Sequence, residues 1–127
     1  MNQRTSLLTG VVFGGLGVAI GAFGAHALRP VLEANGRTET FELAVRYQFY
    51  HAFAILFSGV LMNHFPSRNI NRSVVCFTAG ILIFSGSLYA LSLSGVRLLG
   101  AITPVGGVLF IAGWFLLFLG INAKKPL

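Results

Sequence analysis

The chain has 127 residues, of which 55% are hydrophobic and only 9% are charged. Soluble domains usually carry about 25% charged residues, so this composition excludes an ordinary water-facing surface and predicts an integral membrane protein. The net charge of +6 does not indicate a nucleic-acid partner, because the basic residues fall between apolar runs and form no concentrated patch. The length suits about four membrane spans of roughly 20 residues each, joined by short connections.

The first predicted span covers about residues 6–28. Its glycines recur at intervals of four and three residues, which places them on one face of a helix: Gly10, Gly14, Gly17, Gly21 and Gly24. Lipid tolerates these glycines because the backbone cannot leave the helix without losing hydrogen bonds, and a glycine face lets another helix approach closely. A cleaved signal peptide ending at Ala25-His26-Ala27 is the alternative. The long apolar run and the glycine face favour a retained span.

The second predicted span covers about residues 41–62, with Thr38 as its N-cap and Phe65-Pro66 after its end. The connection between the first two spans is polar enough to lie among the lipid headgroups. Within that connection, Val31 and Leu32 are placed to dip into the interface.

The third and fourth spans are predicted at about residues 73–93 and 104–121. Thr103-Pro104 resembles an N-cap followed by proline at the first helical position. Three more glycines recur every seven residues in the fourth span and are predicted to pack against another helix: Gly106, Gly113 and Gly120. Trp114 lies in mid-span and is interpreted as a packing residue. The predicted fold is therefore all-α: a single-domain (1–127) integral membrane four-helix bundle with glycine-rich helix contacts.

An even number of spans places both termini on one side of the membrane. The basic residues expected on that side are Arg4, Arg68, Arg72, Lys124 and Lys125. Those expected opposite are Arg29, Arg37 and Arg97, with Arg46 just inside the membrane, so the count is five against three or four. Because cytoplasmic loops carry an excess of basic residues, this asymmetry favours both termini in the cytoplasm.

The second span is unusual because it combines several polar side chains with aromatic ones. At 100° per residue, Glu42, Arg46 and Tyr50 form one strip, where Glu42 and Arg46 are spaced to form an ion pair. Nearly opposite lies a second strip of small, polar and aromatic residues, which is expected to face other helices: Ala44, Tyr47, Gln48, His51, Ile55 and Ser58.

His51 is predicted to lie roughly 13–15 Å below the start of its helix, near the bilayer centre. One interpretation is a neutral histidine bonded to a backbone carbonyl or to a hydroxyl such as Ser85, Ser87 or Tyr89, which would specify packing. The other is a proton-accepting or ligand-binding group, since histidine titrates near neutral pH. The candidate polar intramembrane site is thus His26, Tyr47, Gln48, His51, Ser85, Ser87 and Tyr89.

Cofactor and catalytic motifs are not indicated. His26 is expected about 10 Å shallower than His51, which disfavours a haem held between two histidines. No carboxylate cluster accompanies the histidines, so the sequence predicts no metal site. Cys76 is the single cysteine and is interpreted as a small packing residue. Ser85-Gly86-Ser87 does not match a nucleophile elbow, and we expect the protein not to be an enzyme.

Four blocks in order carry a family resemblance: Gly21–Leu28 (GAFGAHAL), Ala44–Ala52 (AVRYQFYHA), Phe84–Tyr89 (FSGSLY), and Ile102–Gly107 (ITPVGG) followed by Gly113-Trp114. The chain resembles the small bacterial membrane proteins called domain of unknown function 423, or uncharacterised protein family 0382. Human transmembrane protein 256 is more distantly similar. The resemblance implies a four-helix inner-membrane protein and supplies no activity. It points to Thr103 and Pro104 as motif positions, together with the candidate polar site.

Two functions remain open on the sequence. The first is a structural or accessory protein that packs through its glycine faces against copies of itself or a larger membrane complex. The second is an oligomeric small-solute or proton-conducting protein that uses the His/Tyr/Gln strip of the second span.

Overall fold

The computed structural model describes residues 1–123, and every regular element in that range is helical. The longer helices are α1 (Gln3–Ala25), α3 (Thr38–Leu61), α4 (Arg68–Gly80), α5 (Gly86–Ser94) and α6 (Thr103–Asn122). The short elements are α2 (Arg29–Ala34), the π-helical turn η1 (Ile81–Ser85) and the 3₁₀ turn η2 (Arg97–Ala101). Because η1 joins α4 to α5 without a break, these three elements form one rod, Arg68–Ser94.

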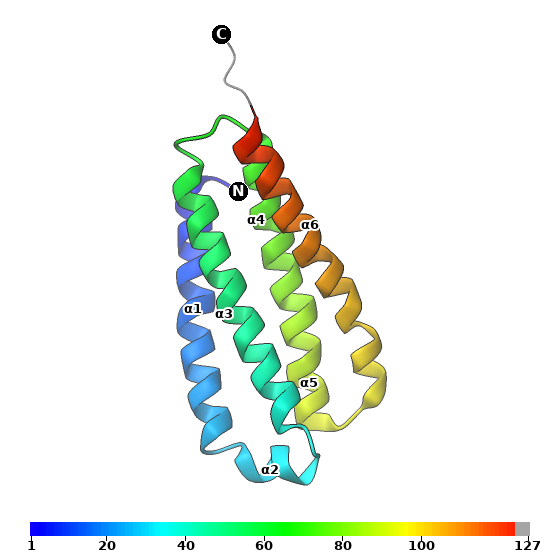
Figure 1. The fold of residues 1–127 in the computed structure, drawn as a ribbon. Helices are drawn as coiled ribbons and strands as arrows, with labels where there is room; N and C mark the ends of the chain where they lie inside the picture. Colours follow the sequence, from blue (N-terminus) through cyan, green and yellow to red (C-terminus); the bar gives the residue numbers. More distant parts are fainter. Residues whose placement is uncertain (124–127) are drawn as a thin grey trace.

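Helix α3 occupies the middle of the molecule. It packs against α1 on one side and against the α4–α5 rod on the other, and α6 packs along α4 and η1 (Figure 1). Helix α2 crosses the end of the molecule where α1 finishes (Figure 1). Met1 lies at the opposite end with the last turn of α6, because Asn71 Nδ2 bonds to the Met1 carbonyl at 2.5 Å and Gly120 contacts Ile70.

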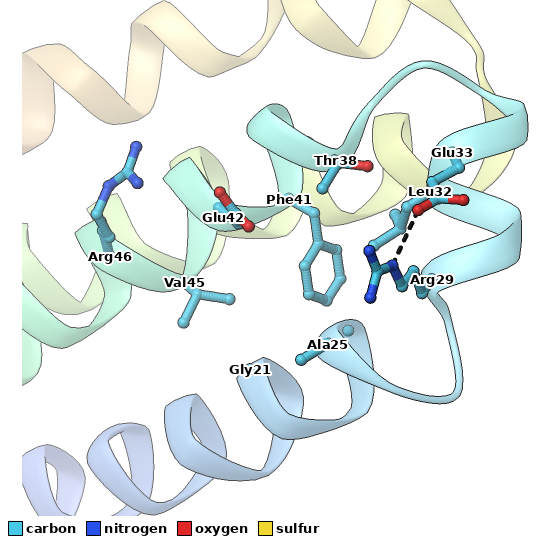
Figure 2. Close-up of a pocket in the computed structure, with 11 residues that line it drawn as sticks. Gly21, Ala25, Arg29, Leu32, Glu33, Thr38, Phe41, Glu42, Val45 and Arg46 are labelled. Atoms are coloured by element: carbon cyan, nitrogen blue, oxygen red, sulfur yellow. Dashed lines mark hydrogen bonds and ion pairs between the residues drawn. The ribbon is translucent and has the colours of Figure 1, made fainter.

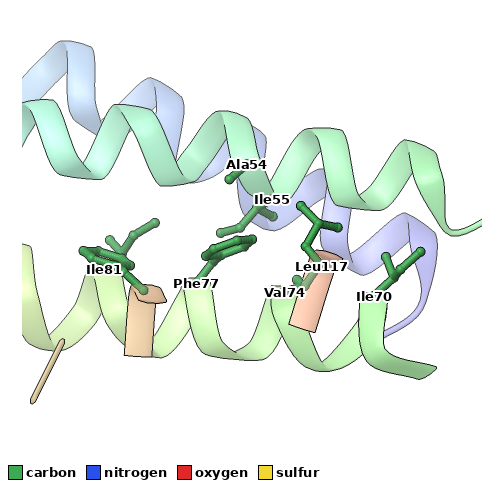
Figure 3. Packing of buried hydrophobic residues seen from close by; sticks show 8 residues of the cluster. Ala54, Ile55, Ile70, Val74, Phe77, Ile81 and Leu117 are labelled. Atoms are coloured by element: carbon green, nitrogen blue, oxygen red, sulfur yellow. The ribbon is translucent and has the colours of Figure 1, made fainter. Parts of the chain in front are cut away.

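The larger apolar core lies between α3, the α4–α5 rod and α6 (Figure 3). Helix α4 and η1 supply a stripe at intervals of four, three and four residues: Ile70, Val74, Phe77 and Ile81. This spacing keeps the four side chains on one helical face. Ala54 and Ile55 meet them from α3, and Phe110 and Leu117 meet them from α6.

Three helical segments are long and apolar enough to cross a membrane: Gln3–Ala25, Arg68–Ser94 and Arg97–Asn122. In the segment Gln3–Ala25, only 17% of the most apolar 18-residue stretch is buried inside the molecule. Most of that helix therefore presents apolar side chains outward. Helix α3 has 24 residues but does not belong to this set, because its charged and polar side chains lower its hydropathy. The fourth membrane span therefore stays a prediction.

Glycines let two pairs of helices approach closely. A methyl group in place of the Gly10 hydrogen would lie 2.6 Å from Leu56 Cγ, and one on Gly17 would lie 3.0 Å from the Phe49 ring, both on α3. Gly24 meets the Phe41 ring in the same way. On α6, three glycines face the α4–α5 rod at Phe84, Phe77 and Ile70: Gly106, Gly113 and Gly120.

The remaining α1 glycines contribute less to these contacts. Gly14 has no atom within 4 Å of where its Cβ would be, and Gly21 would meet Val45 at 3.3 Å. A residue four positions from Gly10 is turned about 40° away from it, whereas a residue seven positions on is turned only about 20°. The contact with α3 therefore follows the seven-residue repeat, and the intervening glycine at position 14 lies outside it.

Several predicted helix ends shift by a few residues. Helix α1 begins earlier than expected because the Asn2 side chain caps it, accepting from Thr5 N at 2.8 Å. It ends at Ala25, before Pro30 opens α2. The two predicted threonine caps are wrong: Thr38 and Thr103 are the first residues of α3 and α6, and neither helix has a side-chain cap.

The connection after α1 contains the unpredicted helix α2. Leu32 is 2% exposed and packs into the protein, while Val31 is 43% exposed. The expectation that both residues dip into the interface is therefore wrong for Leu32. The Asn35 side chain then ties this connection to the end of α5 by donating to the carbonyls of Ser92 and Leu93.

Candidate functional site

The polar strip of α3 is buried between helices. Gln48 and His51 are 3% and 5% exposed, and Ala44, Ile55 and Ser58 of the same strip are fully buried. Glu42, Arg46 and Tyr50 lie on the exposed side. Of the two strips expected from helical periodicity, the one with Gln48 and His51 is buried and the one with Arg46 is exposed.

Gln48 joins three helices. Its Nε2 donates to the Phe13 carbonyl of α1 at 2.8 Å, and its Oε1 accepts from the Tyr89 hydroxyl of α5 at 2.6 Å. The amide thus uses its donor and acceptor ends in opposite directions, which fixes its orientation. Rotation of α3 against either neighbour would break one of these bonds.

His51 is bonded on both ring nitrogens. Nδ1 lies 2.8 Å from the Tyr47 carbonyl, and Nε2 lies 3.1 Å from Trp114 Nε1 on α6. A carbonyl can only accept and an indole N–H can only donate. The imidazole is therefore neutral, with its hydrogen on Nδ1 and its lone pair on Nε2.

The His51 ring also lies flat on Phe110. Their ring centroids are 3.6 Å apart and the planes differ by 8°. Tyr47, one turn earlier, stacks on Phe84 at 4.7 Å between centroids. The strip therefore contacts α6 and η1 through aromatic faces as well as through hydrogen bonds.

The predicted hydroxyl partners of His51 bond elsewhere. Ser85 donates to the Ala44 carbonyl of α3 at 2.7 Å, and the Ser87 hydroxyl lies 2.6 Å from the Thr103 hydroxyl at the start of α6. Tyr89 bonds to Gln48. Of the two kinds of hydrogen-bond partner predicted for His51, a backbone carbonyl or a hydroxyl, the structure shows the backbone carbonyl of Tyr47. All three hydroxyls nonetheless connect helices.

His26 lies apart from this cluster. It follows the last residue of α1, which ends three residues before the expected boundary, and it is exposed. The site that the structure brings together therefore contains Tyr47, Gln48, His51, Ser85, Ser87 and Tyr89, without His26.

Trp114 is the member that sequence analysis did not identify. Its ring was interpreted as packing, and no local pattern connects it to His51, which lies 63 residues earlier. The Gly113-Trp114 pair belongs to the fourth block of the family resemblance, and this is the one sequence feature that points to Trp114. Gly113 admits the Phe77 ring, and Trp114 then packs edge-on against Phe77 at 5.1 Å.

The predicted ion pair between Glu42 and Arg46 is wrong. The ion pair found among residues 1–123 joins Arg29 Nε to Glu33 Oε1 at 2.9 Å, on α2. Glu42 and Arg46 instead line a pocket of about 510 Å³ between α1, α2 and α3 (Figure 2). Sequence analysis did not predict this pocket, because it predicted no helix in the connection that contains α2.

Buried polar groups of the described chain are all bonded: each buried side-chain nitrogen or oxygen in residues 1–123 has a hydrogen-bond partner. Within the same residues, no three His, Cys, Asp or Glu side chains are grouped closely enough to hold a metal ion. The geometry of the strip is thus that of a closed network joining α1, α3, α5 and α6.

Comparison with known proteins gives a consistent result. The family described as "Protein of unknown function (DUF423)" matches residues 20–107. A UPF0382 membrane protein of Staphylococcus haemolyticus is 42% identical over 117 residues, covering 92% of this chain and 94% of the relative. The UPF0382 inner membrane protein YgdD of Escherichia coli K12 is 41% identical over 127 residues, covering 98% and 95%.

A UPF0382 membrane protein of Staphylococcus epidermidis is 43% identical over 115 residues, covering 91% of this chain and 93% of the relative. No solved structure matches the chain. The resemblance inferred from the sequence blocks is confirmed by these matches, which extend along nearly the whole length. The chain is a membrane protein that belongs to the DUF423 family, also called UPF0382, whose function is unknown.

Proposed function

We propose that α3 crosses the membrane beside the three apolar segments, so that the chain is a four-helix bundle with glycine-rich helix contacts. The support is its position: α3 lies between α1 and the α4–α5 rod and runs alongside both (Figure 1). Its polar side chains Gln48 and His51 are buried against those neighbours, which removes the cost of exposing them to lipid.

We propose that this bundle is a structural or accessory membrane protein without catalytic activity. The observation that carries the proposal is Gln48, whose two amide ends bond α1 and α5 at the same time. A polar group that served transport or catalysis would need a free lone pair or proton in a water-filled path. Here Gln48 and His51 bond to other parts of the same chain and act as an adhesive between helices.

The glycine repeats supply the second kind of contact. Gly10, Gly17 and Gly24 admit side chains of α3, so this repeat is used within the chain. Gly14 and the adjacent Gly15 have open space beside them. We propose that this part of α1 faces a second copy of the chain or a larger membrane complex.

We place the bundle in the bacterial inner membrane with both termini in the cytoplasm. Relatives carry the names membrane protein and inner membrane protein. The start of α1 and the end of α6 lie at the same end of the bundle (Figure 1), where Arg4, Arg68 and Arg72 also belong. Lys124 and Lys125, which count toward the same side, lie outside the described residues.

The test compares stability with ion flux for one substitution. If the protein is structural, His51→Ala should lower the melting temperature of the detergent-solubilised protein. Liposomes carrying wild type and a pH-sensitive dye then leak protons no faster than empty liposomes. A flux that depends on wild-type protein and disappears in His51→Ala would instead support the conducting function. Gentle extraction should also yield an oligomer or a fixed partner, and a monodisperse, partner-free monomer would contradict the accessory role.

A further inference from the structure

We propose that the pocket between α1, α2 and α3 binds the headgroup of a phospholipid with a primary amine, and that its acyl chains lie along the exposed face of α3. The occupant is a lipid of the surrounding bilayer whose phosphate meets Arg46 and whose ammonium group meets Glu42. This inference rests on the proposed placement of α3 across the membrane.

The position of the pocket is that of a membrane boundary. It has a volume of about 510 Å³ and opens where α1 ends, at Gly24 and Ala25, beside the crossing helix α2 (Figure 2). The apolar candidate span Gln3–Ala25 stops at the same level. In Figure 2, Phe41 and Val45 point from α3 toward α1. The pocket therefore combines an apolar wall with a rim of charged side chains.

The charges of the rim are complementary to a zwitterionic headgroup. Two arginines and two glutamates line the pocket, and Arg29 and Glu33 neutralise each other in the ion pair on α2. Glu42 and Arg46 form no ion pair with each other or with another residue of the described chain. Residues four apart on a helix have Cβ atoms about 5–6 Å from each other. One anion and one cation thus lie side by side, as the phosphate and the ammonium do in such a headgroup.

A path for the acyl chains continues from Arg46 along α3. Four large side chains on this face are at least half exposed: Tyr50 (55%), Phe53 (64%), Phe57 (55%) and Val60 (50%). At 100° per residue they all lie within about 40° of Arg46. The stripe from Arg46 to Val60 rises about 21 Å at 1.5 Å per residue, enough to cover one leaflet of about 15 Å.

The same features distinguish this occupant from other phosphate ligands. An anionic headgroup such as phosphatidylglycerol brings a phosphate that Arg46 can pair with but no cation, so Glu42 would stay without a counter-ion. Inorganic phosphate would leave the stripe of Tyr50, Phe53 and Phe57 without a partner. Phosphatidylcholine matches the charges, but its quaternary ammonium has no N–H to donate to Glu42.

The experiment uses the full chain in nanodiscs containing equal amounts of phosphatidylethanolamine, phosphatidylglycerol and phosphatidylcholine. After transfer into mild detergent, native mass spectrometry counts the lipids retained by each protein. Wild type should keep phosphatidylethanolamine in preference to the other two. Arg46→Gln should retain about tenfold less, the effect of losing one charged hydrogen bond. Glu42→Gln should lose the preference among headgroups.

Arg97→Gln is the matched control, because Arg97 is exposed at the same end of the molecule and does not line the pocket. It should retain lipid as wild type does. All three variants change exposed side chains, and circular dichroism verifies that they fold. Equal retention by wild type and Arg46→Gln, or a preference for phosphatidylglycerol, would overturn the proposal. Protection of the detergent-solubilised protein against heat by millimolar inorganic phosphate alone would assign the pocket to a free anion instead.

A labelling experiment separates failure of the lipid site from failure of the proposed fold. In a Cys76→Ser background, Phe53→Cys in intact liposomes should resist a water-soluble maleimide. Leu98→Cys, which is 77% exposed in η2, should react with it once both faces are accessible. Protection of position 53 without selective lipid retention overturns the lipid site alone. Rapid labelling of position 53 overturns the membrane placement of α3.

Discussion

Trp114 donates its indole N–H to Nε2 of His51 at 3.1 Å, which connects α6 to α3 across the apolar core. The bond completes the pairing of the imidazole, whose Nδ1 already lies 2.8 Å from the Tyr47 carbonyl. It also specifies which face of α6 meets α3, because an indole offers a single donor. Through this bond Trp114, which is about half exposed, contacts the buried His51.

The first prediction concerns this bond. Trp114→Phe keeps an aromatic ring but leaves Nε2 of His51 without a donor. The free energy of unfolding, measured by titration from mild detergent into SDS, should fall by about 0.5–2 kcal/mol, the range for polar contacts within membranes. Phe115→Leu is the control, since Phe115 is 59% exposed on the same helix and should change stability little. Equal effects of the two substitutions would mean that the indole bond contributes nothing.

The second prediction concerns the bridge from α3 to α5. Gln48→Leu removes the acceptor of the Tyr89 hydroxyl, and Tyr89→Phe removes the donor to Gln48. Each single variant should be less stable than wild type because each leaves a partner without its hydrogen bond. The double variant should lose less than the sum, with a coupling of about 0.5–1.5 kcal/mol in the SDS titration. Strict additivity would contradict a direct bond.

The third prediction separates two kinds of glycine. Gly106→Ala places a methyl group against the backbone and Cβ of Phe84. These atoms cannot move aside as the end of a flexible side chain could. Overpacking of this kind should cost about 1–3 kcal/mol. Gly14→Ala meets open space and should leave the stability of the monomer unchanged or slightly raised. Thermal unfolding of both variants in the same detergent measures the difference, and a reversed order would refute the packing seen at Gly106.

A different pair of substitutions, Gly14→Leu and Gly107→Leu, tests the outward face of α1. In liposomes at low protein density, energy transfer between labelled copies should fall for Gly14→Leu if α1 contacts a second copy. Gly107→Leu is the comparison, because Gly107 also has room beside it, with the nearest atom 4.0 Å away, but it lies on α6. Unchanged energy transfer in Gly14→Leu would exclude this part of α1 as a contact between copies.

The fourth prediction concerns the apolar core. Phe77 is fully buried between α3 and α6, so Phe77→Ala leaves a cavity and removes the edge-on contact with Trp114. We expect a loss of about 2–4 kcal/mol, below the usual upper range because lipid weakens the hydrophobic part of the effect. Phe118→Ala, at a position 64% exposed, should cost far less. Tryptophan fluorescence follows both transitions, since Trp114 is the single tryptophan.

Helical periodicity and composition were sufficient for the features that depend on a single helix. The apolar content indicated lipid as the solvent, and the 100° repeat of residues 41–62 separated the buried side of Gln48 and His51 from the exposed side of Arg46 and Tyr50. Local patterns encode such features because the residues of one helical face are close in sequence.

The partners of those faces were decided by tertiary structure. The bonds from His51 to Trp114 and from Gln48 to Phe13 join residues 63 and 35 positions apart, and no periodicity within one helix specifies how two helices are rotated against each other. No repeat within α1 specifies that Gly10, Gly17 and Gly24 contact α3 while Gly14 does not. The pocket beside α2 likewise depends on how three helices lie against each other. The order of residues along each helix thus dictates which of its faces must be covered. The neighbour that covers each face follows from three-dimensional packing, because contact geometry is a property of pairs of helices.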